Sequence, residues 1–287
     1  MWGRRSPRPT TMLNGVAVRG PTGGCAHVSE PNTGFQNLST EQLRELMQVL
    51  EGADSVELKL TVPDGDQRSA VAALEMDPLE AEIRQVFFLD TDDLLLDRNG
   101  VIARARRTRE GDDSVIKLRP VVPSALSAHL RKLPDFGVEV DAMPGGFVCS
   151  ARLKADLRAG KVKEVTTGKR PQGSLFTKQQ RAFFAQSLPD GVDVDIDALS
   201  VLGPITVLKL KFHPKDFDRR LVAELWFYPD GSRILELSTK CAPTEAFDVA
   251  VRTRVFLESR GIDLTGAQQT KTRTALEYFS QERTSGD

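Results

Sequence analysis

The sequence predicts an α+β protein in which β-strands with one charged face curl into a barrel and helices pack outside it. Two observations predict this fold. Several short segments alternate apolar and charged side chains, as strands do because successive residues point to opposite faces. Other segments carry apolar residues at helical spacing between capping signals.

Helices are expected before, within and after the alternating segments. The first begins after Ser39, which caps the backbone while Gln42 reaches back to it, and it ends at Gly52. Further helices are expected at 66–76, 124–133, 244–260 and 268–279, with two more between 149 and 185.

The alternating segments are the expected strands. They cover 55–62, 84–91, 100–108, 114–119, 136–142, 201–212, 221–228 and 232–240. The triplet Pro229–Asp230–Gly231 indicates a hairpin between the last two. Residues 1–37 are rich in Gly, Pro, Ser and Thr and predict a disordered leader. The segment 38–287 then forms one domain, with a helical insertion at about 122–200.

Charge is concentrated on one face of these strands. That face carries three anions, Glu57, Glu224 and Glu236, and eight cations, Lys59, Arg104, Arg106, Lys117, Arg119, Lys209, Lys211 and Lys240. The excess is five positive charges, whereas the whole chain has a net charge of −1. A half-solvated sheet explains any one such strand, but exposed faces usually mix in Thr, Ser and Gln. The repetition therefore favours a barrel with this face inward.

A confined cationic interior predicts an anionic ligand. Uncompensated charges crowded in a barrel cost on the order of several kcal/mol each unless an anion lies among them. The carboxylates on the same face suit Mg²⁺ or Mn²⁺, which bind hard oxygen ligands and bridge them to phosphate. The interior is therefore expected to bind a polyphosphate together with a divalent metal.

The bulk composition excludes other classes of protein. A net charge of −1 gives no general attraction to nucleic acid or to membranes. Cys25, Cys149 and Cys241 form neither a disulfide framework nor a zinc motif, which is typical of a reducing cytoplasm. No apolar run approaches the roughly 20 residues that span a bilayer. None of these features defines the oligomeric state.

The order of the charged motifs resembles the CYTH, or triphosphate tunnel metalloenzyme, superfamily. Glu57-Leu58-Lys59 resembles the E-x-K end of its first strand, and Arg104-Ala105-Arg106 its R-x-R strand. Glu236 and Lys271 resemble its late acidic strand and C-terminal lysine. The resemblance covers about 55–279. It implies a closed antiparallel barrel of about eight strands with helices outside, as in class IV adenylate cyclases and thiamine triphosphatases.

The resemblance also implies roles for particular residues. Metal binding would fall to Glu57, Glu224 and Glu236. Phosphate binding would fall to Lys59, Arg104, Arg106, Lys117, Lys271 and one of Lys209 and Lys211, with Lys59 and Arg106 most directly catalytic. Ser55 and Ser238 stand where the family often has glutamates, which predicts fewer or weaker metals. The insertion is expected to be a lid, a partner surface or a small domain.

Three functions are compatible with these motifs. The first is a metal-dependent phosphohydrolase acting on a nucleoside triphosphate, inorganic triphosphate or thiamine triphosphate. The second is an adenylate cyclase that forms cyclic AMP from ATP, a reaction that needs the same binding of the polyphosphate chain. The third is a non-catalytic polyphosphate- or nucleotide-binding protein, which the two serines favour.

Overall fold

The computed structural model of the protein describes residues 39–264 and 271–285. Its strands are β1 (Ser55–Val62), β2 (Glu82–Asp90), β3 (Val101–Thr108), β4 (Asp112–Leu118), β5 (Phe136–Met143), β6 (Gly146–Leu157), β7 (Ser200–Phe212), β8 (Leu221–Phe227) and β9 (Arg233–Cys241). Its helices are α1 (Thr40–Glu51), α2 (Gln67–Ala73), α3 (Leu95–Arg98), α4 (Lys161–Thr166), α5 (Lys178–Ser187), α6 (Ala246–Ser259) and α7 (Lys271–Ser285). The predicted leader lies outside the described residues.

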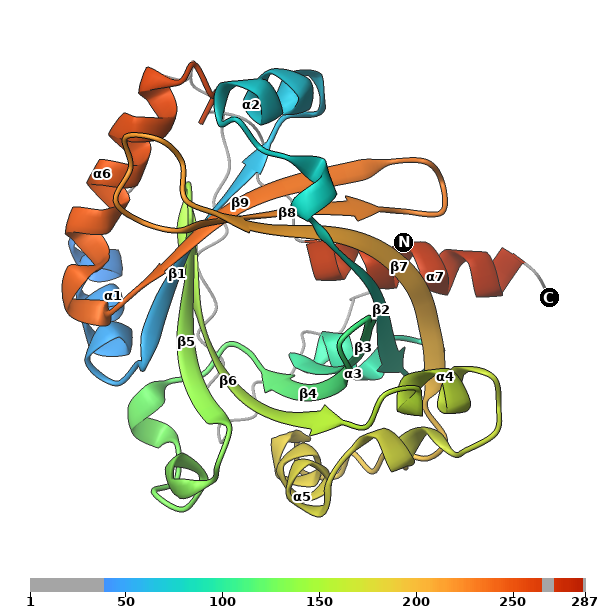
Figure 1. Ribbon diagram of the computed structural model, residues 1–287. Helices are drawn as coiled ribbons and strands as arrows, with labels where there is room; N and C mark the ends of the chain where they lie inside the picture. The colour runs from blue at the N-terminus through green and yellow to red at the C-terminus, as the bar shows by residue number, and fades with distance from the viewer. Residues whose placement is uncertain (1–38, 265–270, 286–287) are drawn as a thin grey trace, which may run out of the picture.

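The strands close into a single barrel, viewed along its axis in Figure 1. Their order around the wall is β1-β5-β6-β4-β3-β2-β7-β8-β9, and β9 pairs with β1 to close the ring. The predicted closed barrel with outer helices is confirmed. β1 and β5 run parallel, however, and the other pairs are antiparallel, so the sheet is mixed.

The barrel has nine strands where about eight were expected, and the additional strand is β6. Residues 149–157 of this strand were predicted to be helical because Ala, Arg, Leu and Lys favour helices. The alternation of apolar and charged side chains outweighs this helix preference. Cys149, Ala151 and Leu153 are buried on the outer side of the barrel, and Arg152 and Lys154 lie on the inner side. Of the predicted insertion at 122–200, β5 and β6 therefore belong to the barrel wall. The expected helix at 124–133 consists only of two short 3-10 turns.

Helices cover much of the outside of the barrel. Leu46 and Leu50 of α1 pack on β1, β5 and the start of α6, and the α1 cap has the predicted Ser39–Gln42 capping box. Phe183 and Phe184 of α5 bury the outer face of β3, β4 and β6 together with α4. α2 and the end of α6 cover β1, β8 and β9. No helix in the described part of the chain is long and apolar enough to cross a membrane.

Helix α7 closes one end of the barrel from the inside. Near this end the inward strand faces become apolar, with Trp226 two residues beyond Glu224 on β8. Ala275, Leu276 and Phe279 of α7 pack against these side chains and are themselves buried. Because α7 fills this end, the opposite mouth of the barrel gives access to the charged interior.

Candidate functional site

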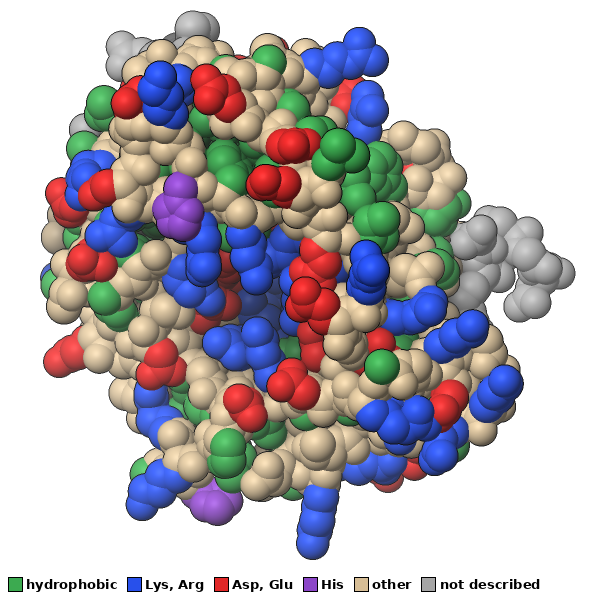
Figure 2. Space-filling view, viewed as in Figure 1, with side chains coloured by type: hydrophobic (Ala, Val, Ile, Leu, Met, Phe, Trp, Pro, Cys, Tyr) green, Lys and Arg blue, Asp and Glu red, His purple; other side chains and the backbone are tan. Residues whose placement is uncertain are grey.

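Most of the charged side chains on the strands point into the barrel. Figure 2 looks into a hollow in which Lys and Arg side chains gather, with Asp and Glu beside them. Strand register places the following charged residues on the inward face: Glu57, Lys59, Arg84, Arg104, Arg106, Asp113, Lys117, Glu139, Asp141, Arg152, Lys154, Lys209, Glu224 and Glu236. They fall into three groups, which differ in how completely their charges are paired.

The first group is a carboxylate cluster on β1 and β5. Glu57 and Asp141 are direct partners in the parallel pairing, and Glu139 lies one inward position along β5. One carboxylate oxygen from each of these three residues lies within 4.8 Å of the others. Like charges at this spacing repel, so the cluster requires cations among its oxygens.

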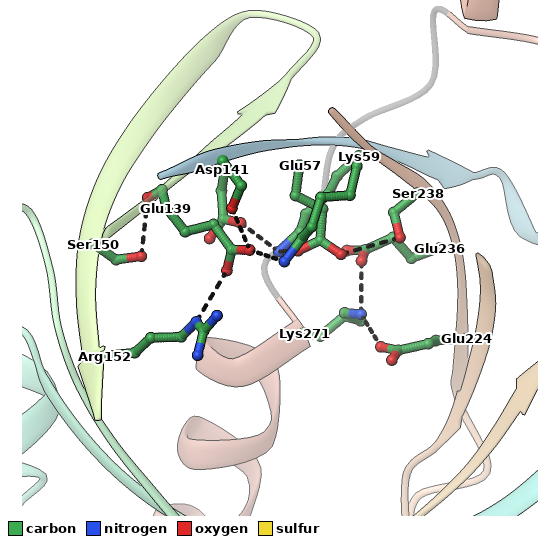
Figure 3. Close-up of polar contacts among 12 residues, drawn as sticks. Glu57, Lys59, Glu139, Asp141, Ser150, Arg152, Glu224, Glu236, Ser238 and Lys271 are labelled. Atoms are coloured by element: carbon green, nitrogen blue, oxygen red, sulfur yellow. Dashed lines mark hydrogen bonds and ion pairs between the residues drawn. The ribbon is translucent and has the colours of Figure 1, made fainter. Parts of the chain in front are cut away.

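Lysines supply those cations (Figure 3). The Nζ atom of Lys59 lies 2.8 Å from Asp141 Oδ1 and 3.3 Å from Glu57 Oε2. Lys117 Nζ donates to Asp141 Oδ2 at 2.9 Å, and Lys240 contacts Glu139. Burial alone would raise the pKa of Asp141, but Lys59 and Lys117 hold it well below its usual range. Burial opposes the charge of Lys59 as well, yet Asp141, Glu57 and Glu236 raise its pKa.

The second group surrounds Lys271, the first residue of α7. Its Nζ atom donates to Glu224 Oε2 at 2.6 Å and to Glu236 Oε1 at 2.7 Å, so it bridges β8 and β9 (Figure 3). It also lies 5.0 Å from the ring centroid of Trp226, in a cation–π contact. Lys209 donates to the other Glu224 oxygen at 2.8 Å. Burial disfavours the charged Glu224, but Lys271 and Lys209 lower its pKa well below the usual value.

The third group lies on β3, β4 and β6 and is mostly cationic. Arg106 Nε donates to both Asp113 oxygens, at 2.9 and 3.0 Å. Arg104 forms no hydrogen bond or ion pair with any described residue, and its Nε atom is buried without a partner. Burial and the neighbouring Arg106 lower the pKa of Arg104 to about 10. Lys154 has no partner among the described residues either, and Arg152 lies 4.0 Å from its nearest carboxylate oxygen, on Glu139.

The structure brings most of the predicted site residues into the interior. Lys59, Arg104, Arg106, Lys117, Lys209 and Lys271 all lie there. Of the two alternatives on β7, Lys209 contacts Glu224 inside the barrel, whereas Lys211 is exposed further along the strand. Lys240 is half exposed near the cluster, and Arg119 follows β4, where burial lowers its pKa against the opposing influence of Asp97 and Asp141.

The three predicted metal ligands are divided between two groups. Glu57 lies with Glu139 and Asp141, whereas Glu224 and Glu236 share Lys271 (Figure 3). The only group of three carboxylates in the described chain with metal-ligating spacing is therefore the one on β1 and β5. Ser238 donates its hydroxyl to Glu57 Oε1 at 3.3 Å.

Sequence reasoning missed several interior residues. Glu139 and Asp141 alternate with buried valines along β5, which is the signal that identified the other charged strands. Arg152 and Lys154 were missed because β6 was assigned to helices. Asp113 lies one residue before the predicted strand 114–119, and Arg84 is the first residue of the predicted strand 84–91. Among the inward strand residues named above, eight cations face six anions, so the excess is two positive charges instead of the predicted five.

This arrangement suits a ligand that carries several negative charges. Carboxylate oxygens are the ligands that hard divalent cations prefer, and Glu57, Glu139 and Asp141 could hold one. Their lysine partners could turn to an incoming anion, because a flexible ammonium group exchanges partners readily. The side chains of Arg104 and Lys154 have no ion-pair partner in the described part of the chain and would gain the most from an anion.

Comparisons with known proteins agree with the fold. No protein-family model and no curated protein matches the sequence. Among solved structures, the chain is similar to HpAC1 from Hippeastrum, described as a candidate adenylyl cyclase with a dominant triphosphatase activity. The TM-score is 0.57 at 18% identity, over 77% of this chain and 95% of that one. A candidate adenylate cyclase from Bacillus halodurans gives a TM-score of 0.51 at 13% identity, over 77% and 98%. The shared architecture is the tunnel fold expected from the CYTH resemblance.

Proposed function

We propose that this protein is a metal-dependent phosphohydrolase that acts on a triphosphate-bearing substrate inside the barrel. The observation that carries the proposal is the unequal pairing of charge in the interior. Arg104, whose Nε atom is buried without a partner among the described residues, faces the same interior as three clustered carboxylates. A polyphosphate that binds with a divalent cation satisfies both features. The triphosphatase activity described for HpAC1 is consistent with this function.

The metal site that fits best is Glu57, Glu139 and Asp141. Their hard oxygen donors suit Mg²⁺ or Mn²⁺. Glu224 and Glu236 share Lys271 at 2.6 and 2.7 Å, and among the described residues no third carboxylate lies close enough to complete a ligand set with them. When bound, such a metal would supply Lewis-acid polarisation of a phosphoryl oxygen.

The basic residues would bind and orient the phosphate chain. Lys59 and Lys117 are positioned to exchange Asp141 for phosphate oxygens on entry of the substrate. Arg106 is held by Asp113 in a bidentate pair, which fixes its direction before the substrate arrives. Preorganised cations of this kind stabilise the charge that develops during phosphoryl transfer. Helix α7 fills one end of the barrel and excludes water from that end of the site.

The proposal is tested by following both phosphate and cyclic AMP. The protein would be incubated with inorganic triphosphate or ATP, in Mg²⁺ and then in Mn²⁺. The variants are Lys59→Ala, Arg106→Ala and, as a control, Arg68→Ala on the outer helix α2, where the side chain is exposed. We expect phosphate release that both interior variants lose and the control keeps. Cyclic AMP as the main product would make the protein a cyclase. No turnover in any combination would leave a polyphosphate-binding protein.

A further inference from the structure

A second concentration of positive charge lies outside the barrel, on the segment 158–181 that contains α4 and the start of α5. Lys and Arg side chains gather at the lower right of Figure 2, where Figure 1 draws α4. The segment has a net charge of +6, whereas the whole chain has a net charge of −1. Its single anion is Glu164, and its seven cations are Arg158, Lys161, Lys163, Lys169, Arg170, Lys178 and Arg181. We call these cations the outer basic face.

The barrel wall holds this segment in place from beneath. Val162 and Val165 of α4 are buried against the outer side of the strands. The backbone N–H of Val162 donates to Asp112 Oδ2 at 2.8 Å. In α5, the side chain of Gln180 is fully buried and donates to the backbone carbonyl oxygen of Leu153 at 3.1 Å. Because the apolar side of the segment is anchored, its charged side chains are directed toward solvent.

Most of the outer basic face has no carboxylate to neutralise it. Glu164 is shared by Arg158 and Arg170, and Arg181 lies 3.2 Å from Asp197. Asp197 belongs to an acidic stretch after α5 and marks one border of the face. Four lysines contact no carboxylate among the residues that the structure describes: Lys161, Lys163, Lys169 and Lys178. The face therefore keeps a positive charge that an anionic partner would neutralise.

The side chains around these cations indicate which anionic partner fits. None of the exposed large hydrophobic side chains in the described chain lies within 158–181, and Phe176 is buried. Segments that lie on membranes usually carry Trp, Phe or Leu beside their cations. Proteins that bind single strands usually stack bases on aromatic side chains. The face instead offers charge together with polar groups such as Thr167 and Gln179, which are exposed. Side chains of these kinds contact the phosphates of a double helix.

We propose that the outer basic face binds the phosphate backbone of a double-stranded nucleic acid without sequence preference. A duplex carries one negative charge per about 1.7 Å of its axis, and its bases are stacked inside. Contacts with phosphates alone supply non-specific binding, with a Kd of about 1–100 µM at physiological salt. The net charge of the whole chain does not reveal this surface, because acidic residues elsewhere cancel it. The inference is independent of the proposed function, because the face lies outside the barrel.

Fluorescence anisotropy with a labelled DNA duplex that has no 5′ phosphate tests the proposal. The full chain is titrated at several salt concentrations against the duplex and against one of its single strands. We expect tighter binding of the duplex. For the four unpaired lysines, the logarithm of the association constant should fall with the logarithm of salt concentration with a slope of about −4.

Paired substitutions separate the outer basic face from other cations. The double variant Lys163→Gln/Lys169→Gln should weaken duplex binding by about 10- to 100-fold at low salt and make the slope shallower by about 2. The matched control is Lys132→Gln/Lys215→Gln, two exposed lysines outside the segment, which should bind as the wild type does. Arg104→Ala, which removes a cation from the interior, should also leave duplex binding unchanged.

Three results would overturn the proposal. The first is the absence of duplex binding at low salt. The second is equal binding by the wild type and the Lys163→Gln/Lys169→Gln variant, or a loss of binding in Arg104→Ala instead. The third is sedimentation with phosphatidylserine vesicles by a protein that ignores the duplex, which would assign the face to a membrane. Phosphate release from inorganic triphosphate should be the same in the double variant and the wild type, so failure of this inference and failure of the proposed function are distinguishable.

Discussion

Replacement of Asp141 by Asn perturbs the centre of the carboxylate cluster without changing its volume. Asp141 is 3% exposed and contacts the ammonium groups of Lys59 and Lys117 at 2.8 and 2.9 Å. Removing one partner of a buried ion pair costs about 3–5 kcal/mol. Lys59 keeps Glu57 at 3.3 Å and both lysines keep some contact with solvent. We therefore expect the free energy of unfolding to fall by about 3 kcal/mol.

The same substitution should change binding in two opposite directions. Two lysines released from Asp141 should strengthen metal-free binding of inorganic triphosphate. Loss of one of three carboxylates should weaken Mn²⁺ binding by at least about tenfold. Urea denaturation and calorimetry measure the three quantities, with Asp190→Asn as an exposed control that should stay within about 0.5 kcal/mol of the wild type. An Asp141→Asn variant with wild-type stability and wild-type Mn²⁺ affinity would refute the reasoning.

Further predictions concern stability in acid, the ion pairs of Lys271, the packing of α7 in the end of the barrel, and the contact of Ser238 with Glu57. Lys59 and Lys117 lower the pKa of Asp141 against the effect of burial. Its stabilisation is therefore fully present above the unfolded pKa of about 3.9 and is lost progressively as the pH falls from that value toward the lower folded pKa. A urea series from pH 6 downward should show this loss only below about pH 4, and Asp141→Asn should remove it. Lys271→Met leaves Glu224 and Glu236 without their shared cation and should cost about 3 kcal/mol. Adding Glu224→Gln should recover part of this cost, and strictly additive losses would contradict the pairing. Leu276→Ala removes a fully buried contact between α7 and the barrel and should cost about 2–5 kcal/mol by urea denaturation, whereas a cost below about 1 kcal/mol would show that α7 is not packed there. Ser238→Glu should lower the melting temperature without metal, because Ser238 now contacts a Glu57 oxygen, and Mn²⁺ should restore it; no response to Mn²⁺ would separate this position from the metal site.

Much of the fold could be predicted because strand alternation is a local signal. β1 was expected at the residues where it is found, and the interior cations of β3 and β7 followed from their spacing. β6 was missed because its residues favour helices individually. Only pairing with β4 and β5, which lie elsewhere in the chain, makes it a strand.

The composition of the site was less predictable because pairing between distant segments determines it. Glu236 and Glu57 both lie in the interior, as expected. The sequence alone does not reveal that β5 runs beside β1, which brings Asp141 to Glu57. Nor does it reveal that Lys271 lies between Glu224 and Glu236, since α7 folds back into the barrel from the other end of the chain. The best-fitting metal ligands changed for these reasons.

A crystal structure of the protein with Mn²⁺ and inorganic triphosphate would test the central claim most directly. The account predicts an anomalous Mn²⁺ peak between the carboxylates of Glu57, Glu139 and Asp141. It also predicts phosphate oxygens within hydrogen-bonding distance of Arg104 and Arg106. Triphosphate bound outside the barrel, or Mn²⁺ bound to Glu224 and Glu236 with Lys271 displaced, would contradict it.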